Sequence, residues 1–493
     1  MSKNITELDL SAIVEKIGKK EISAEKVATE FKGQIEKLNP QINAFITVND
    51  DCLNQAQEID RRLAKGEKVG RLAGAPMAIK DMFCTKGLRT TAASKMLHNF
   101  VPAYSATVVE KLQAEGAIVM GKTNQDEFAM GSSNETSHFG ACRNPWNLDY
   151  VPGGSSGGSA AAVSARMSCA AVGTDTGGSI RQPANFCHLV GVKPTYGRVS
   201  RYGIVAFASS LDQAGPMTRT VRDAALILEV ISGRDEKDTT CAIKEVPKWS
   251  ENLSSQLRGM RVGMPIEYFN HGIADDVRAT VMRAADILKA QGAELVELSL
   301  PLTKFAVPIY YLIATCEASS NLARYDGVRY GYRADFSKQA AADLEEFYSR
   351  NRGEGFGSEV KRRIVLGTYA LSSGYYEAYY KKACQVRRLL RQDFIDAFKK
   401  CDVILSPASP TPAFKIGERI DNPLEMYLND IYTTSANLAG IPGMSVPAGF
   451  SRNKLPIGVQ LLSAHFEEQK ILNAAYTLEQ SLKLTAEVPH VLQ

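Results

Sequence analysis

The sequence predicts an α/β protein in which helices cover a β-sheet. Between residues 260 and 299, a short strand, a helix over 274–290 and a second strand follow one another. This alternation is typical of β-α-β units. Later apolar runs predict three more strands and a closing helix, at 403–406, 443–446, 457–461 and 466–483.

Two helical regions accompany the predicted sheet. Apolar residues repeat with helical spacing at 6–18 and 22–38, and the second helix is expected to stop at Pro40, so we predict a helical N-terminal lobe within 1–70. Residues 305–400 are mostly helical and rich in Tyr and Arg. Because strand character returns after them, we interpret them as an excursion from one domain that spans 1–493.

Local signals place the elements between these regions. We expect a strand, a helix, a second strand, a second helix and a third strand in turn, at 44–48, 51–64, 74–81, 106–115 and 117–120. Residues 191–200 and 211–219 are rich in Gly, Pro and polar side chains, and a helix over 220–231 follows them. Both segments are therefore predicted to be loops.

Composition narrows the function classes. The 493 residues include 58 basic and 54 acidic side chains, a net charge of +4, so no global field indicates nucleic-acid binding. The chain has no run of eighteen apolar residues and no signal-peptide core near its start, which predicts a cytoplasmic protein without contact with a membrane. Nine scattered cysteines without C-x-x-C spacing predict reduced thiols, and the six histidines show no metal-ligand spacing.

The most informative stretch holds two Gly/Ser clusters, GGSSGGS at 153–159 and GTDTGGSIR at 173–181. Glycine allows close approach to main-chain N–H groups, so we expect two facing loops. A helix over 159–167 between them would aim its free N–H groups at the first cluster, which suits an oxyanion. A flexible linker is the plain alternative. A nucleophile elbow also matches G-x-S-x-G, but residues 147–152 before it make a poor core strand.

Lys80 closes the short apolar strand at 74–81. A lysine in that position commonly extends its amine to solvent. The functional alternative is a desolvated, neutral amine that serves as a base, because burial lowers the pKa of a lysine. Position alone leaves both interpretations open.

Residues 116–123 (GAIVMGKT) match the P-loop pattern, which keeps a nucleotide-binding enzyme as a rival hypothesis. In a P-loop the strand precedes the first glycine. Here the four residues between the glycines are Ala-Ile-Val-Met, a strand in their own right, so the glycines are better explained as turns.

Lys80 and the two clusters together resemble the amidase signature family over nearly the whole chain. The resemblance implies a single domain with a central mixed β-sheet covered by helices on both faces. It also implies a Ser-Ser-Lys triad, here Ser179 as nucleophile, Ser155 in a cis peptide and Lys80. The backbone N–H groups of Thr176, Gly177 and Gly178 are then placed to hold an oxyanion.

Four further motifs are similar to the A subunits of tRNA-dependent amidotransferases, at 126–133, 317–321, 359–363 and 426–430. This narrower resemblance implies glutamine hydrolysis, with glutamine held by Tyr310, Arg363 and Asp430 and with 305–400 forming part of the pocket. Arg362 is the alternative to Arg363. A simpler alternative for the whole chain is a free-standing amidase for another small amide, and a third is a scaffolding or nucleotide-binding subunit.

The same resemblance implies partners. The ammonia would pass to a larger, tRNA-binding B subunit that amidates glutamyl-tRNA(Gln), and a small C subunit would complete the complex. This chain needs no cofactor or metal, whereas ATP and Mg²⁺ are expected to be used by the B subunit. The resemblance leaves open whether aspartyl-tRNA(Asn) is also served and how the partners dock.

Overall fold

The computed structural model of the chain describes residues 4–269, 272–420 and 422–493. One mixed sheet of 11 strands runs through these residues, in the order β1-β3-β2-β4-β6-β5-β10-β11-β9-β7-β8. The strands are β1 (Phe45–Val48), β2 (Pro76–Lys80), β3 (Ile118–Thr123), β4 (Ala170–Asp175), β5 (Val190–Lys193), β6 (Gln213–Thr218), β7 (Arg261–Pro265), β8 (Glu294–Leu298), β9 (Val403–Pro407), β10 (Gly443–Phe450) and β11 (Pro456–Ser463).

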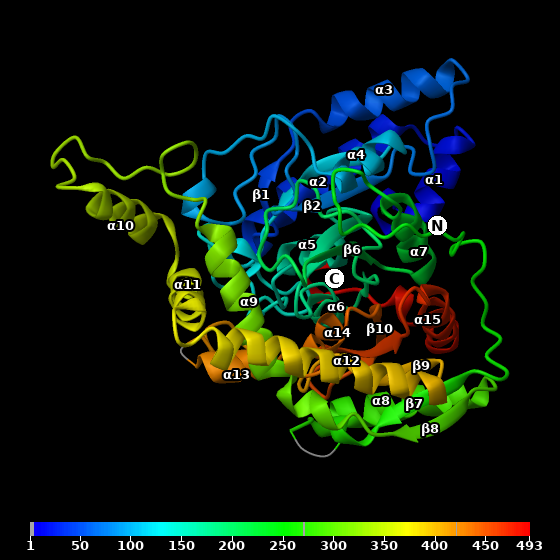
Figure 1. Cartoon of the computed structure of the whole chain (residues 1–493). Helices are drawn as coiled ribbons and strands as arrows, with labels where there is room; N and C mark the ends of the chain where they lie inside the picture. Colours follow the sequence, from blue (N-terminus) through cyan, green and yellow to red (C-terminus); the bar gives the residue numbers. More distant parts are fainter. Residues whose placement is uncertain (1–3, 270–271, 421) are drawn as a thin grey trace.

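Helices surround this sheet (Figure 1). They are α1 (Leu10–Gly18), α2 (Ala24–Ile42), α3 (Cys52–Ala64), α4 (Thr107–Ala114), α5 (Gly157–Ser164), α6 (Arg181–Phe186), α7 (Val221–Ile231), α8 (Asp275–Ala290), α9 (Ala306–Leu322), α10 (Leu344–Gly355), α11 (Ser358–Leu371), α12 (Lys382–Lys400), α13 (Pro423–Leu428), α14 (Thr434–Ala439) and α15 (Glu468–Leu482). In the described part of the chain, no helix is long and apolar enough to cross a membrane.

Alternating side chains show that both faces of the sheet are covered. In β9, Val403 and Leu405 belong to the apolar cluster formed with α7, α8 and α15. Ile404, between them, belongs to the cluster formed with α9, α12 and α14. Because successive strand residues point to opposite faces, these are two layers, and the predicted mixed sheet with helices on both faces is confirmed.

Two of the predicted loops are wrong, because β5 and β6 are strands in the middle of the sheet. Both are fully buried. β6 pairs with β4 and β5, and β5 also pairs with β10. Their Gly and Pro residues misled the prediction: Gly215 lies where a Cβ would overlap the carbonyl oxygen of Val192 in the neighbouring strand, so glycine serves close strand approach here.

The N-terminal lobe has the predicted helices and also the predicted strand at 44–48, which is β1 and joins the sheet edge by pairing with β3. α2 does not stop at Pro40 but continues to Ile42. The next residue, Asn43, has a left-handed φ of 57°, and its N–H donates to Asn39 O. A left-handed cap therefore ends this helix, and Pro40 is tolerated in the last turn.

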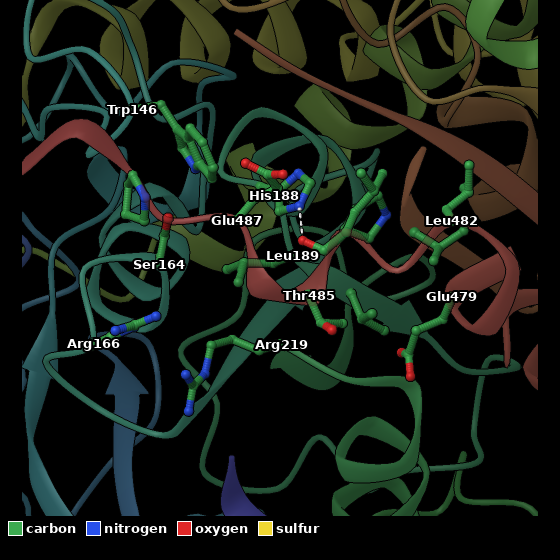
Figure 2. Close-up of a pocket in the computed structure, with 15 residues that line it drawn as sticks. Trp146, Ser164, Arg166, His188, Leu189, Arg219, Glu479, Leu482, Thr485 and Glu487 are labelled. Carbon is green, nitrogen blue, oxygen red and sulfur yellow. Dashed lines mark hydrogen bonds between the residues drawn. The ribbon is translucent and has the colours of Figure 1, made fainter. Parts of the chain in front are cut away.

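A small cavity of about 30 Å³ lies where the C-terminal residues meet the sheet (Figure 2). Trp146, Arg219, Glu479 and Leu484 are among its lining residues, and it includes none of the predicted site residues. The predicted site residues therefore lie elsewhere in the described chain.

Gly367 fixes how closely α11 packs on α9. A Cβ at this position would overlap the carbonyl group of Thr315 in α9. We expect Gly367→Ala to lower the free energy of unfolding by about 1–3 kcal/mol, since one helix has to move away from the other. Gly353→Ala is the matched control, because a Cβ there meets nothing within 4 Å. Equal stability of the two variants in urea titrations would contradict this packing.

Candidate active site

Lys80 is fully buried at the carboxyl end of β2. Its Nζ lies 2.8 Å from Ser155 Oγ and 2.8 Å from Thr174 Oγ1. The amine therefore does not extend to solvent. Burial lowers the pKa of Lys80 to about 7, although the negative charges of Asp126 and Asp175 act in the opposite direction. A large fraction of the amine is therefore neutral near neutral pH.

Ser155 lies in the first of the two loops that the sequence predicts to face each other. The Gly154–Ser155 peptide bond is cis, as the family resemblance implies. A Cβ on Gly154 would overlap the Asp126 carboxylate, and the Gly154 N–H donates to Gln182 Oε1 at 3.0 Å. The Ser156 N–H donates to Ser179 O at 3.2 Å, which joins the first loop to the second.

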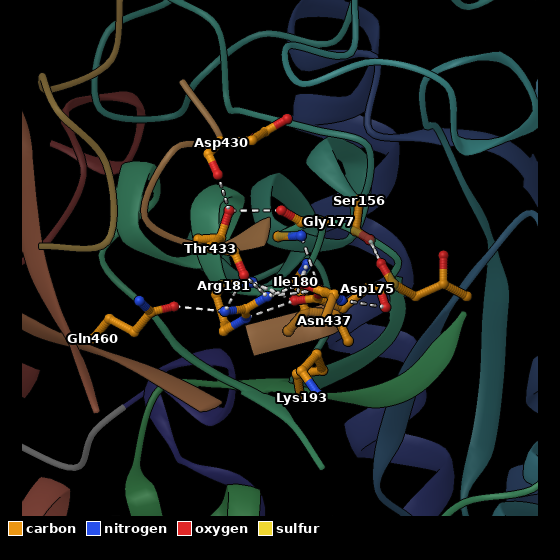
Figure 3. A network of polar contacts seen from close by, with 12 residues as sticks. Ser156, Asp175, Gly177, Ile180, Arg181, Lys193, Asp430, Thr433, Asn437 and Gln460 are labelled. Atoms are coloured by element: carbon orange, nitrogen blue, oxygen red, sulfur yellow. Dashed lines mark hydrogen bonds and ion pairs between the residues drawn. The ribbon is translucent and has the colours of Figure 1, made fainter. Parts of the chain in front are cut away.

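Ser179 stands in the loop between β4 and α6 and, unlike Lys80 and Ser155, is partly accessible, at 8% exposure. Asp175 and Arg181, at the two ends of this loop, form an ion pair (Figure 3). Arg181 Nε donates to Asp175 Oδ2 at 2.9 Å, and both side chains are fully buried. The structure thus brings Lys80, Ser155 and the loop that carries Ser179 together.

The predicted oxyanion donors need a correction at Gly178. Its N–H donates to Asp175 Oδ1 at 2.9 Å, because the carboxylate closes a turn three residues ahead of itself. Among the described residues, the N–H groups of Thr176 and Gly177 find no acceptor, and neither does that of Ser179. Thr176, Gly177 and Ser179 are therefore the donors that remain, and the last was missed.

The bounds of α5 differ from the prediction, and part of its start is occupied. This helix begins at Gly157, two residues before the predicted start. The N–H of Gly158 donates to Asn124 O at 3.0 Å and to Asn134 Oδ1 at 2.9 Å. The N–H of Gly158 is therefore occupied, whereas those of Gly157 and Ser159 find no acceptor among the described residues.

Two of the predicted glutamine contacts, Tyr310 and Asp430, lie beside the loop that carries Ser179. Tyr310 on α9 packs on Gly177, where a Cβ would lie 2.7 Å from its Oη. The Thr433 hydroxyl lies 2.6 Å from Gly177 O and 3.2 Å from Asp430 O. Thr433 therefore links Asp430 to the loop that carries Ser179.

Arg363 lines a cavity of about 300 Å³ together with Ser132, Glu359 and Tyr427. Its side chain is 3% exposed, whereas that of Arg362 is 46% exposed. Within the described chain, Arg363 donates a hydrogen bond only through Nε, so its two terminal nitrogens remain for a ligand. The geometry favours Arg363 over Arg362.

Ser132 was missed as a member of this site. It lines the same cavity, and its hydroxyl donates to Asp430 Oδ2 at 2.6 Å. Burial raises the pKa of Asp430 to about 7, although Ser132 and Arg363 act in the opposite direction. Ser132 lies within the motif at 126–133. That motif indicated the family but assigned no role to this serine.

The P-loop hypothesis is wrong. Gly121, Lys122 and Thr123 are the last residues of β3. The Lys122 side chain is fully buried, with Nζ 3.4 Å from Asp81 Oδ1. An extended, ion-paired lysine does not wrap around a phosphate. No group of three or more side chains with metal-binding character occurs within 4–269, 272–420 and 422–493.

The site combines a lysine, a serine hydrogen-bonded to it and a second serine, which lies beside unoccupied backbone N–H groups. This arrangement is typical of a serine hydrolase that uses lysine in place of histidine. Residues 26–472 match the family model described as Amidase. The chain is 61% identical over 489 residues to the A subunit of glutamyl-tRNA(Gln) amidotransferase from Bdellovibrio bacteriovorus, covering 99% of this chain and 100% of that one.

Solved structures agree. The A subunit of the same enzyme from Thermotoga maritima has a TM-score of 0.80 and 43% identity, covering 97% of this chain and 96% of that one. Native peptide amidase from Stenotrophomonas maltophilia has a TM-score of 0.83 and 30% identity, covering 98% and 99%. The chain belongs to the amidase family and is a close homologue of glutamyl-tRNA(Gln) amidotransferase A subunits.

The burial of Lys80 predicts a pH profile. Because the neutral amine is the form able to accept a proton, kcat/KM for a simple primary amide should rise as the pH rises through about 7 and then level off. A substrate without an α-ammonium avoids the titration of Asp430. Lys80→Arg should be nearly as inactive as Lys80→Ala, since a guanidinium does not deprotonate. Substantial activity of the arginine variant would exclude a proton-accepting lysine.

Proposed function

We propose that this chain is the glutamine-hydrolysing subunit of a tRNA-dependent amidotransferase. One observation carries the proposal: the buried Arg363, with two terminal nitrogens left for a ligand, lines the same cavity as Ser132, whose hydroxyl donates to Asp430 Oδ2. The Thr433 hydroxyl in turn joins Asp430 O to Gly177 O in the loop that carries Ser179. A guanidinium pairs with an α-carboxylate through two parallel hydrogen bonds, and a carboxylate suits an α-ammonium. The close homology to named A subunits supports the same conclusion.

The reaction follows from the relay. Neutral Lys80 accepts the proton of Ser155, which accepts that of Ser179, and Ser179 Oγ bonds to the side-chain amide carbon. The N–H groups of Thr176, Gly177 and Ser179 stabilise the oxyanion. As the C–N bond breaks, the relay returns the proton to nitrogen, and ammonia leaves. Water then cleaves the acyl-enzyme ester to release glutamate.

The product ammonia needs an acceptor. In our proposal a larger B subunit uses ATP and Mg²⁺ to activate glutamate on tRNA(Gln) and then takes up the ammonia, while a small C subunit steadies the complex. Relatives of this chain are named as the A subunits of such enzymes. The P-loop-like segment of this chain is a buried strand, which supports assigning the ATP step to the partner.

The proposed clamp, formed by Arg363 and Asp430, can be tested with a substrate that lacks the groups it would bind. Arg363→Ala and Asp430→Ala should each weaken kcat/KM for glutamine by the equivalent of about 2–5 kcal/mol, because each leaves one substrate charge unpaired in a confined pocket. Propionamide, which lacks both α-groups, should be unaffected by either change. Ser179→Ala should abolish turnover of both. Equal losses of Arg363→Ala on both amides would assign Arg363 a structural role.

The partners should raise glutaminase activity. We expect slow glutamine hydrolysis by the chain alone and a faster rate in the assembled complex with misacylated tRNA and ATP, because misplacement by about 1 Å can cost a hundredfold in rate. The rate should be measured for the chain alone, with its partners, and with all substrates. A chain that is fully active alone and ignores every addition would favour a free-standing amidase.

A further inference from the structure

Glu359 is half-buried beside Arg363, the predicted partner of the substrate carboxylate, and the proposed reaction gives it no role. Its Oε1 accepts from Arg363 Nε at 2.8 Å and from the Tyr427 hydroxyl at 3.1 Å. Its Oε2 accepts from Arg362 Nη1. Three donors thus hold one carboxylate, whose side chain is 12% exposed.

The guanidinium of Arg363 is oriented by this carboxylate and by aromatic rings. Glu359 and Arg363 stand one turn apart on α11, so the pair is set by helix geometry. The rings of Phe207, Tyr311 and Tyr427 lie 5.7, 5.2 and 5.7 Å from the guanidinium carbon. With Nε held by Glu359, the edge that carries the two terminal nitrogens is the part left to meet a ligand.

Tyr427 connects this end of the pocket to the other. Its hydroxyl contacts Glu359 on α11, and its ring stacks on Tyr311 of α9 at 3.8 Å between centroids. Its carbonyl oxygen accepts from the N–H of Asp430 at 3.2 Å. One residue therefore contacts the helices that carry Tyr310 and Arg363 and also the backbone of Asp430.

We propose that Glu359 and Tyr427 are positioning residues that hold Arg363 at a fixed place relative to Asp430, and so make the pocket selective for amides of α-amino acids. The inference rests on the proposed function, because it needs the clamp to bind a carboxylate and an ammonium. In such a substrate both charges are attached to one carbon. Two protein groups can pair with both only when their separation is held within a fraction of an ångström.

The test compares three amides in the complex assembled from the full chain and its partner subunits. They are glutamine, glutaric acid monoamide, which lacks the ammonium, and γ-aminobutyramide, which lacks the carboxylate. The variants are Glu359→Ala, Glu359→Gln and Tyr427→Phe. Tyr369→Phe is the matched control for the hydroxyl, and Glu377→Gln is the control for the carboxylate, since both residues are exposed.

Glu359→Ala should raise KM for glutamine and for glutaric acid monoamide by about tenfold, because a hydrogen bond to a charged group is lost. Its kcat/KM for γ-aminobutyramide should stay at the wild-type value. Glu359→Gln should largely restore KM, since a glutamine oxygen still accepts from Arg363 Nε. Tyr427→Phe should raise KM for the same two carboxylate-bearing amides by about threefold.

Two results would overturn the inference: an equal loss on all three amides in Glu359→Ala, or a Glu359→Gln variant no better than the alanine variant. Failure of the proposed function is distinguishable from both. In that case the wild-type complex itself would show no preference for glutamine over the two truncated amides.

Discussion

The buried ion pair between Asp175 and Arg181 is the interaction on which the reacting loop depends (Figure 3). Arg181 also donates to the carbonyl of Thr433, to Asn437 Oδ1 and to Gln460 Oε1. Burial alone would raise the pKa of Asp175, but Arg181 holds it at about 2. A charge pair without water is stable only when its hydrogen bonds are satisfied, and here they connect β4, α6, α14 and β11.

The sheet brings the predicted relay residues together because β2 and β4 are parallel neighbours. Carboxyl ends of parallel strands meet at one edge, so Lys80, at the end of β2, comes close to Thr174 near the end of β4. The same edge excludes water from the amine, which lowers its pKa. Recognition comes from different elements, since α9, α11 and the α13–α14 region supply the predicted substrate contacts. The predicted relay residues and the predicted substrate contacts thus lie on separate parts of one chain.

Several features could be predicted locally and others could not. Helix and strand periodicity located most elements, and the glycines located the two facing loops. β5 and β6 were missed because their Gly and Pro residues have strand roles only next to particular neighbours, as Gly215 has beside Val192. Gly178 was predicted to be an oxyanion donor because a glycine can be recognised from the sequence alone. Its N–H instead donates to Asp175 in a turn that only the folded chain forms.

By itself, the sequence determined the fold class and the family and predicted the relay residues, because these depend on periodicity, on glycine positions and on motifs along the chain. Only the tertiary structure decided that Lys80 is desolvated, that Arg363 is buried while Arg362 is largely exposed, and which N–H groups stay unoccupied. Tyr427 and Glu359 are 68 residues apart. Their contact arises from helix packing, and packing depends on side chains that no local pattern brings together.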